Sequence, residues 1–302
     1  MDYADIFVSA GDGLRLYARD YGPAGSGALP VVCLPGLTRN SADFHPLAVA
    51  LAGDPVAPRR VLALDYRGRG RSERDPSWRN YDVRVELEDV RQVLTATGVH
   101  EAVFVGTSRG GLITMALSAV RPALIRGAVL NDIGPVIDGT GLVRIRGYVG
   151  KMPQPRSFKE GAEILRELSD SQFPRLDEAA WEAMARTTWI EENGRLVTAY
   201  DPQLMKILEA IDIETPLPVL WHLFEGLKNV PILALRGANS DLLSAQTLKA
   251  MAARHPDLDA VTVPDQGHAP LLTGGLVDRI RAFVARVDGG LETDAPAEAE
   301  AA

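Results

Sequence analysis

A serine between two glycines, in the sequence GTSRGG, has surroundings that point most directly to chemistry. Ser108 follows the apolar run AVFV and precedes LITMAL, a stretch with helical spacing. The spacing Gly-x-Ser-x-Gly between a strand and a helix is that of a nucleophile elbow, a tight turn that holds the serine in a strained backbone conformation. Side chains two residues before and after the serine would collide, so the turn requires Gly106 and Gly110. We predict that Ser108 is a nucleophile, and that Gly111 lets the following helix sit close to the neighbouring strands.

His268 is the histidine best placed to activate this serine. A serine hydroxyl is a useful nucleophile only when a base removes its proton. Of the five histidines, only His268 lies on a loop that follows a late strand, among the turn residues of VTVPDQGHAPLL. We therefore expect His268 to be the general base.

Three aspartates are candidates for the carboxylate that orients this histidine. Asp241, in LALRGANSDLL, comes just past the carboxyl end of a strand and between Ser108 and His268, which is the chain order expected with an elbow. Asp132, in VLNDIGP, also follows a strand, and Asp265 is close to the histidine in sequence. We predict that Asp241 accepts a hydrogen bond from Nδ1–H of His268. Asp132 and Asp265 remain the alternatives for this carboxylate. If Asp241 has no catalytic role, we expect it to cap the helix that begins near LLSAQT.

Acyl transfer at Ser108 also needs hydrogen-bond donors for an oxyanion. We expect one donor to be the backbone N–H of Arg109, at the start of the helix, where the helix dipole adds positive charge. The other is expected from the turn CLPGLTRN, at the N–H of Leu37. The guanidinium of Arg109 could contact substrate or pair with an acid, and the sequence leaves both open.

Strands and helices alternate through most of the chain and would position these residues. Residues 5–10 and 14–22 alternate around GDG and predict a hairpin. Short apolar runs predict buried parallel strands, and stretches with helical spacing lie between them. The predicted strands are 30–36, 60–68, 102–106, 125–134, 230–237 and 259–267, and the predicted helices are 41–53, 82–98, 110–122, 244–256 and 276–287. This alternation predicts an α/β fold with a doubly wound, mostly parallel sheet.

The alternation stops between residues 135 and 227, which have helical patterns and no good strand run. We predict a helical insertion between two strands of the sheet. Its large side chains, among them Trp181, Trp189, Trp221 and Phe224, could cover a site or form the insertion's own core.

Composition limits the partners. The chain has 302 residues and a formal net charge of −8, which argues against nucleic acid as the main partner. The single cysteine, Cys33, lies in an apolar run and is expected in the core. The acidic N-terminal residues and the lack of a long apolar stretch predict a cytoplasmic protein without a membrane span. We expect a small-molecule substrate and no metal or organic cofactor, and the oligomeric state cannot be predicted.

Taken together, these motifs resemble those of the α/β-hydrolase superfamily. LPGLTRN resembles its oxyanion loop, GTSRGG its elbow, RGANSDLL its acid loop and DQGHAPLL its histidine loop. LDYRGRGRS resembles the superfamily's Asp-x-Arg-Gly-x-Gly-x-Ser turn, whose arginines we expect to be internal ion-pair partners and solvated charges rather than a substrate cradle. The resemblance implies a hydrolase core at 1–134 and 228–288 and a helical cap at 135–227 that forms a lid over the serine. Residues 289–302 are acidic and lack apolar anchors, so we expect a disordered acidic tail there.

A serine at the elbow predicts attack on a carbonyl group, since related dehalogenases and epoxide hydrolases carry aspartate there. We predict a serine hydrolase that cleaves a small, largely apolar carboxylic ester through an acyl-enzyme. The alternatives are a lactonase, a carbon–carbon bond hydrolase of the same fold, or a ligand-binding protein without turnover.

Overall fold

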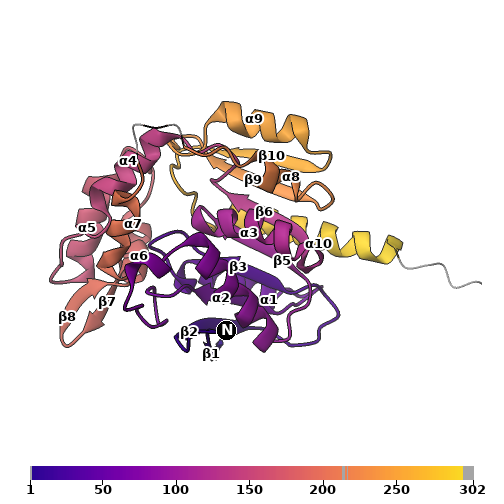
Figure 1. Ribbon diagram of the computed structural model, residues 1–302, viewed down its shortest axis with the longest axis horizontal. Coiled ribbons are helices and arrows are strands. Elements are labelled where there is room, and N and C mark those ends of the chain that lie inside the picture. The colour runs from indigo at the N-terminus through magenta and orange to yellow at the C-terminus, as the bar shows by residue number, and fades with distance from the viewer. Residues whose placement is uncertain (1, 213–214, 216, 295–302) are drawn as a thin grey trace, which may run out of the picture.

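The structure is a computed structural model that describes residues 2–212, 215 and 217–294 (Figure 1). In chain order the strands are β1 (Ala4–Ser9), β2 (Arg15–Tyr21), β3 (Val31–Leu34), β4 (Val61–Asp65), β5 (Ala102–Thr107), β6 (Ile125–Asn131), β7 (Trp189–Glu192), β8 (Arg195–Thr198), β9 (Ile232–Gly237) and β10 (Leu258–Val263). The α-helices are α1 (His45–Ala52), α2 (Val83–Ala96), α3 (Arg109–Val120), α4 (Gly139–Tyr148), α5 (Phe158–Ser169), α6 (Glu178–Thr188), α7 (Met205–Glu209), α8 (Trp221–Glu225), α9 (Ala245–Arg254) and α10 (Gly275–Asp294). Short 3-10 helices are η1 (Ser41–Phe44), η2 (Trp78–Asn80), η3 (Pro122–Leu124) and η4 (Pro202–Leu204).

One eight-stranded sheet has the order β1-β2-β4-β3-β5-β6-β9-β10. From β4 to β10 all neighbouring strands are parallel, whereas β1 and β2 form an antiparallel hairpin whose second strand pairs antiparallel with β4. The prediction of a doubly wound, mostly parallel sheet is therefore confirmed, as is the N-terminal hairpin. Because parallel strands all end at one edge, β5, β6 and β9 bring the residues that follow them close together.

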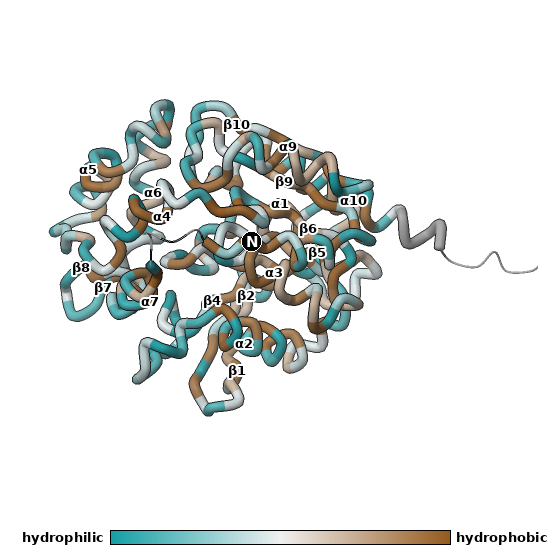
Figure 2. Tube along the Cα trace, turned by 45° about the horizontal axis from the view of Figure 1, so that its top comes forward, coloured by the Kyte–Doolittle hydropathy of each residue, from teal (hydrophilic) through white to brown (hydrophobic). Residues whose placement is uncertain are grey.

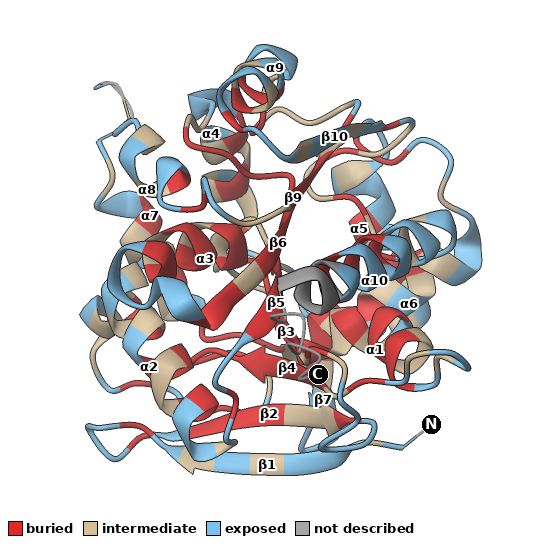
Figure 3. Ribbon diagram, turned by 90° about the vertical axis from the view of Figure 1, so that its right-hand side faces the viewer, coloured by how far each residue is buried: buried red, intermediate tan, exposed pale blue. Residues whose placement is uncertain are grey.

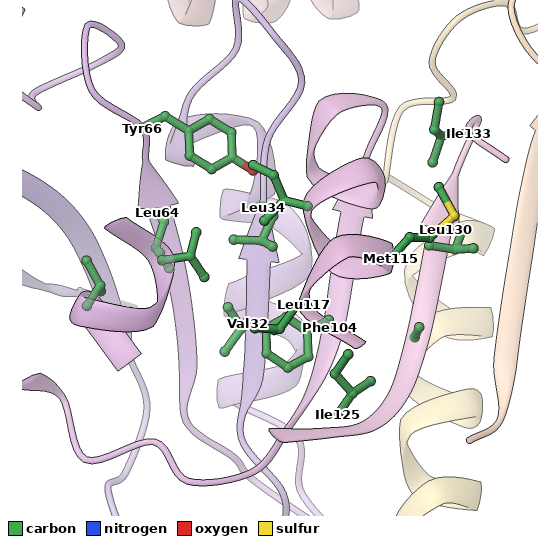
Figure 4. Close-up of a cluster of buried hydrophobic side chains, with 14 of the residues drawn as sticks. Val32, Leu34, Leu64, Tyr66, Phe104, Met115, Leu117, Ile125, Leu130 and Ile133 are labelled. Carbon is green, nitrogen blue, oxygen red and sulfur yellow. The ribbon is translucent and has the colours of Figure 1, made fainter. Parts of the chain in front are cut away.

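Helices cover both faces of the sheet, which is seen nearly edge-on in Figure 3. Side chains of α2, α3, α8 and α9 belong to the hydrophobic cluster on one face, and side chains of α1 and α10 belong to that on the other. Figure 4 shows part of the first cluster, where Phe104 of β5 and Leu130 of β6 lie among Met115 and Leu117 of α3. Strands β3, β4 and β5 read as continuous apolar runs because they are covered on both sides.

Cys33 is a core residue, as predicted. It lies in β3 with no exposed surface, and burial raises the pKa of its thiol. The thiol is therefore kept in its neutral form and packs as a small apolar group.

Helices α4 to α7 and strands β7 and β8, which come between β6 and β9 in the chain, lie to one side of the sheet (Figure 1). Figure 2 shows a hydrophobic stretch on α5. The expectation of no strand there is wrong, because β7 and β8 form an antiparallel hairpin. Asn193 and Gly194 both have positive φ in its turn, at 52° and 73°. Asn-Gly is the usual sequence of such a turn, so the missed hairpin did have a sequence signal.

The large side chains of this segment divide between two cores. Trp181 and Trp189 are buried in a small cluster with Leu165, Phe173 and other residues of the segment itself. Trp221 and Phe224, on α8, pack instead into the main core beside α3. The residues of α8 therefore pack with the sheet rather than with α5 and α6.

The C-terminal helix is longer than predicted. The expected disordered tail at 289–302 is wrong for residues 289–294, whose backbone continues α10, and the rest of that range lies outside the described residues. Within the described part of the chain, no helix is both long and apolar enough to cross a membrane.

Candidate active site

Ser108 occupies a strained turn between β5 and α3. Its φ is 50° and its ψ is −108°, a conformation rarely adopted by residues with a side chain. A Cβ on Gly106 would lie 2.6 Å from backbone atoms of Gly110, and one on Gly110 would lie 2.0 Å from the carbonyl oxygen of Leu34. A Cβ on Gly111 would meet Ile133, just past β6, at 2.2 Å. The three glycines therefore have the steric roles expected of them.

His268 lies beside Ser108, as the sequence predicts. Its Nε2 is 2.9 Å from Oγ of Ser108, which is hydrogen-bonding distance. Only 8% of the His268 side chain is exposed. Asn131, a buried residue of β6, donates from Nδ2 to the carbonyl oxygen of Pro270 at 2.9 Å, and so fixes the loop that carries the histidine.

The carboxylate in contact with the histidine is Asp132, and the expected contact from Asp241 is wrong. Oδ2 of Asp132 is 2.7 Å from Nδ1 of His268 and accepts a second hydrogen bond from Oγ of Ser240 at 2.5 Å. Its Oδ1 accepts from N–H of Gly237 at 2.8 Å, and the side chain is fully buried. Both oxygens of this carboxylate thus have hydrogen-bond partners, which are the backbone N–H of Gly237, the hydroxyl of Ser240 and the imidazole of His268.

Asp241 is held by a different partner. Nε and Nη2 of Arg144, on α4, donate to its two carboxylate oxygens at 2.6 and 2.9 Å. Burial alone would raise the pKa of Asp241, but the hydrogen bonds and charge of Arg144 outweigh burial and lower that pKa. Both oxygens of the Asp241 carboxylate are thus occupied by the bidentate guanidinium of Arg144. This ion pair joins α4 to the loop after β9.

Asp265 also lies away from the histidine's ring nitrogens. Its Oδ2 is 3.0 Å from Nε of Arg175, whose side chain is largely exposed. Of the three aspartates weighed from the sequence, the structure therefore places only Asp132 against His268.

The two backbone amides expected to bind an oxyanion lie on either side of Ser108. Arg109 opens α3 directly after the serine, and N–H groups in a first helical turn have no acceptor within the helix. Leu37 lines the same cavity as Ser108 and His268, and a Cβ on the adjacent Gly36 would be 3.9 Å from Cβ of Ser108. This placement suits both amides to the expected role, which stays a prediction.

Arginines behind the site are ion-paired, as expected. Arg67 pairs with Asp75 and Asp89 at 2.5 and 2.7 Å, and Arg71 pairs with Asp5 at 2.6 Å. Arg109, whose side chain the sequence left unassigned, donates from Nε to Glu86 at 2.7 Å. Its guanidinium is therefore turned toward α2.

A cavity of about 520 Å³ opens over Ser108 and His268. Much of its wall is apolar and comes from the segment between β6 and β9; these lining residues are Ile145, Met152, Leu165, Leu168, Phe173, Leu176, Ala180, Ala183 and Met184. The charged side chains of the wall, other than its two histidines His45 and His268, are those of Arg39, Asp43, Arg144 and Arg186. Such a mainly apolar pocket with a few convergent polar groups is typical of a small-molecule site.

The segment over the cavity is tied to the residues around Ser108. Arg39, just past β3, donates to the hydroxyl oxygens of Thr187 and Thr188 at 2.5 and 2.7 Å. Gln172 accepts at Oε1 from the backbone N–H of His268 at 3.0 Å and donates from Nε2 to the carbonyl oxygen of Asn239 at 3.1 Å. Sequence patterns gave no sign of Gln172, because its role depends on contacts between distant parts of the chain.

No three histidine, cysteine, aspartate or glutamate side chains gather as metal ligands in the described ranges.

The family follows from the fold together with comparisons to known proteins. A family model described as alpha/beta hydrolase fold matches residues 30–147. A 3-hydroxybutyrate-oligomer hydrolase of Cupriavidus necator is 34% identical over 255 residues, which are 80% of this chain and 82% of that protein. The chain therefore belongs to the α/β-hydrolase family and is an α/β-fold hydrolase.

Two further proteins are similar to this chain over most of its length. A crystal structure of an alpha/beta hydrolase from Novosphingobium aromaticivorans has a TM-score of 0.87 and 40% identity, covering 96% of this chain and 99% of the other. A 2-(acetamidomethylene)succinate hydrolase of Mesorhizobium japonicum is 25% identical over 267 residues, 88% of this chain and 90% of that protein.

Proposed function

We propose that this protein hydrolyses small carboxylic esters through an acyl-enzyme, with Ser108 as nucleophile, His268 as general base and Asp132 as the acid that orients the base. The observation that carries the proposal is one chain of contacts. It runs 2.9 Å from Oγ of Ser108 to Nε2 of His268 and 2.7 Å from Nδ1 to Oδ2 of Asp132. A buried, fully bonded carboxylate keeps the proton on Nδ1, so Nε2 is free to accept the serine proton.

The reaction has two balanced halves. In the first, Oγ of Ser108 adds to the ester carbonyl carbon while Nε2 of His268 takes its proton, and that proton then leaves with the alcohol. In the second, water adds to the acyl-serine while Nε2 takes a proton from the water and returns it to Oγ, and the acid departs. In both halves the carbonyl oxygen becomes negative, and the amides of Leu37 and Arg109 are the donors proposed to stabilise it.

The volume of the cavity is suited to an ester whose acyl and alcohol groups are of modest size. A volume of about 520 Å³ accommodates a molecule within the usual range of small-molecule sites. Because much of the wall is formed by residues between β6 and β9, we propose that this segment is a cap that sets the substrate range.

A second, narrower candidate is an ester of a hydroxy acid that ends in a free carboxylate. Apart from its two histidines, the charged side chains of the cavity wall are three arginines and one aspartate, so the wall carries an excess of positive charge. The partners of Arg144 and Arg186, which are Asp241 and Glu182, lie outside that wall. Arg144 is the less exposed of these two arginines, with 26% of its side chain exposed against 56%. The similarity to a hydrolase of 3-hydroxybutyrate oligomers, which end in a carboxylate, supports this candidate.

Labelling with a fluorophosphonate tests the general proposal. The intact protein should label and thereby lose ester hydrolysis, whereas Ser108→Ala should neither label nor hydrolyse the ester. A panel of esters of increasing acyl length, tested beside lactones and diketones, then separates ester hydrolysis from lactone and carbon–carbon bond cleavage. An intact protein that fails to label would favour ligand binding without turnover.

The dimer of 3-hydroxybutyrate and its methyl ester test the narrower candidate. The free acid should have the lower KM with the intact protein, and Arg144→Gln should remove that preference. Arg146→Gln is the matched control, since Arg146 is on the same helix and outside the cavity wall. Equal KM values for the two substrates with the intact protein would contradict a carboxylate site.

A further inference from the structure

We propose that Glu86 is a positioning residue that holds both halves of the oxyanion hole in place through two arginines. The inference rests on the proposed function, because it concerns the amides of Leu37 and Arg109 that would bind the oxyanion. Glu86 contacts neither substrate nor Ser108 in this account. It acts through the side chains that fix those two peptide segments.

The first link joins Glu86 to the residue that follows the nucleophile. Glu86 lies in α2 with no exposed surface. Its Oε2 accepts a hydrogen bond from Nε of Arg109 at 2.7 Å, and Nη2 of the same arginine donates to the carbonyl oxygen of Tyr81 at 2.8 Å. The side chain of Arg109 thus holds the first residue of α3 against α2, in addition to the hydrogen bonds within α3 itself.

The second link joins Glu86 to the loop that contains Leu37. Oε1 of Glu86 is 2.6 Å from Nη1 of Arg69, whose side chain is also fully buried. Nε of Arg69 donates to the carbonyl oxygen of Leu37 at 2.8 Å. One carboxylate therefore connects the turn after β3 to the start of α3, the two segments on either side of Ser108.

The charge balance explains why this connection is rigid. Burial alone would raise the pKa of Glu86, but the charges of Arg109 and Arg69 outweigh it and lower that pKa. The carboxylate therefore stays ionised between two guanidinium groups. A buried ion trio of this kind has few alternative arrangements, because any movement leaves a charge without its partner. Donors fixed before the reaction stabilise a developing charge without having to reorganise.

The neighbouring ion pair provides an internal control. Asp89 lies one turn further along α2 and pairs with Arg67, and both side chains are buried. The side-chain hydrogen bonds that join Arg67 to Asp89 involve neither Leu37 nor Arg109. Asp89→Asn thus removes a buried carboxylate from the same helix without breaking either link.

The test compares Glu86→Gln with Asp89→Asn, using kcat and KM for one ester, the inhibition constant of a trifluoromethyl ketone and the melting temperature. The ketone forms a tetrahedral adduct with serine and so probes the oxyanion hole. Glu86→Gln should lower kcat and weaken the ketone by a similar factor, about ten- to a hundredfold, with little change in KM. Asp89→Asn should lower the melting temperature and leave kcat and the ketone within about twofold.

If Glu86→Gln does not fold, Arg109→Met is the second test of the inference. This variant removes the hydrogen bond from the Arg109 side chain to Glu86 and keeps the backbone N–H of residue 109. It should lower kcat and ketone affinity together. The inference is overturned if the folded variant keeps both values, or if Asp89→Asn loses as much as Glu86→Gln. Turnover that survives Ser108→Ala would instead overturn the proposed function itself, so the two failures are distinguishable.

Discussion

Replacing Asp132 by asparagine is the change that separates the observed site from the one predicted by sequence. Asparagine keeps the shape of the side chain and removes its charge. If its amide nitrogen takes the place of Oδ2, it faces donors from both His268 and Ser240. The imidazole must then move its proton to Nε2, and it can no longer accept the proton of Ser108.

The opposite orientation of the amide is also costly. With its oxygen toward the histidine, the amide nitrogen would face the N–H of Gly237, which now donates to Oδ1 at 2.8 Å. Two donors facing each other in a fully buried site cost about 1–3 kcal/mol. Neither orientation restores the wild-type hydrogen bonds. We therefore expect kcat to fall by about 10³–10⁴, equivalent to roughly 4–5.5 kcal/mol of transition-state stabilisation.

The assay is steady-state hydrolysis of a p-nitrophenyl ester, with Asp241→Asn as the matched control. Asp241 follows the adjacent strand β9 and is bound by Arg144, so its loss should change kcat by less than about tenfold. Circular dichroism and a melting curve establish that both variants are folded. The reasoning would be refuted if Asp241→Asn lost as much activity as Asp132→Asn, or if Asp132→Asn kept kcat within tenfold of the parent.

Three further predictions concern the turn, the segment over the cavity and acid stability. Gly110→Ala should greatly reduce the yield of folded protein or the melting temperature, because a Cβ there would lie 2.0 Å from a backbone carbonyl oxygen of β3; thermal unfolding measures this. Gln172→Leu should lower kcat several-fold by releasing the backbone N–H of His268, and kcat unchanged at equal stability would contradict that role. The pKa of Asp241 is lowered in the folded protein, so its pairing with Arg144 stabilises the fold above its ordinary pKa of about 3.8 and is lost as pH falls through the folded value. The gap in melting temperature between the parent and Asp241→Asn should therefore hold down to about pH 4 and narrow as pH falls below about 3.8, and a gap that stays constant below that pH would oppose it.

The elbow and the strands of the sheet could be predicted from local sequence, because both depend on residues that are close together in the chain. Gly106 and Gly110 are required by the turn that contains Ser108, and the continuous apolar runs of β3, β4 and β5 follow from burial on both faces. The same holds for the hairpin turn at Asn193 and Gly194, whose signal is present in the sequence although we did not predict it.

The choice between Asp132 and Asp241 could not be made from local sequence. Both follow the carboxyl end of a strand, and β6 and β9 are neighbours in the sheet. What separates them is the direction of each side chain and a partner from a distant segment. Asp132 has a φ of 55°, which turns the chain sharply after β6, whereas Arg144 of α4 binds Asp241. Neither the turn nor the long-range ion pair has a sequence pattern.

Acylation of Ser108 during turnover distinguishes this mechanism from any other, and mass spectrometry of the acid-quenched protein detects it. During hydrolysis of an activated ester the account predicts a mass increase of one acyl group, located on the peptide that contains Ser108 and absent from Ser108→Ala. Hydrolysis that continues at the parent rate in Ser108→Ala, or an acyl group carried on another residue during turnover, would contradict it.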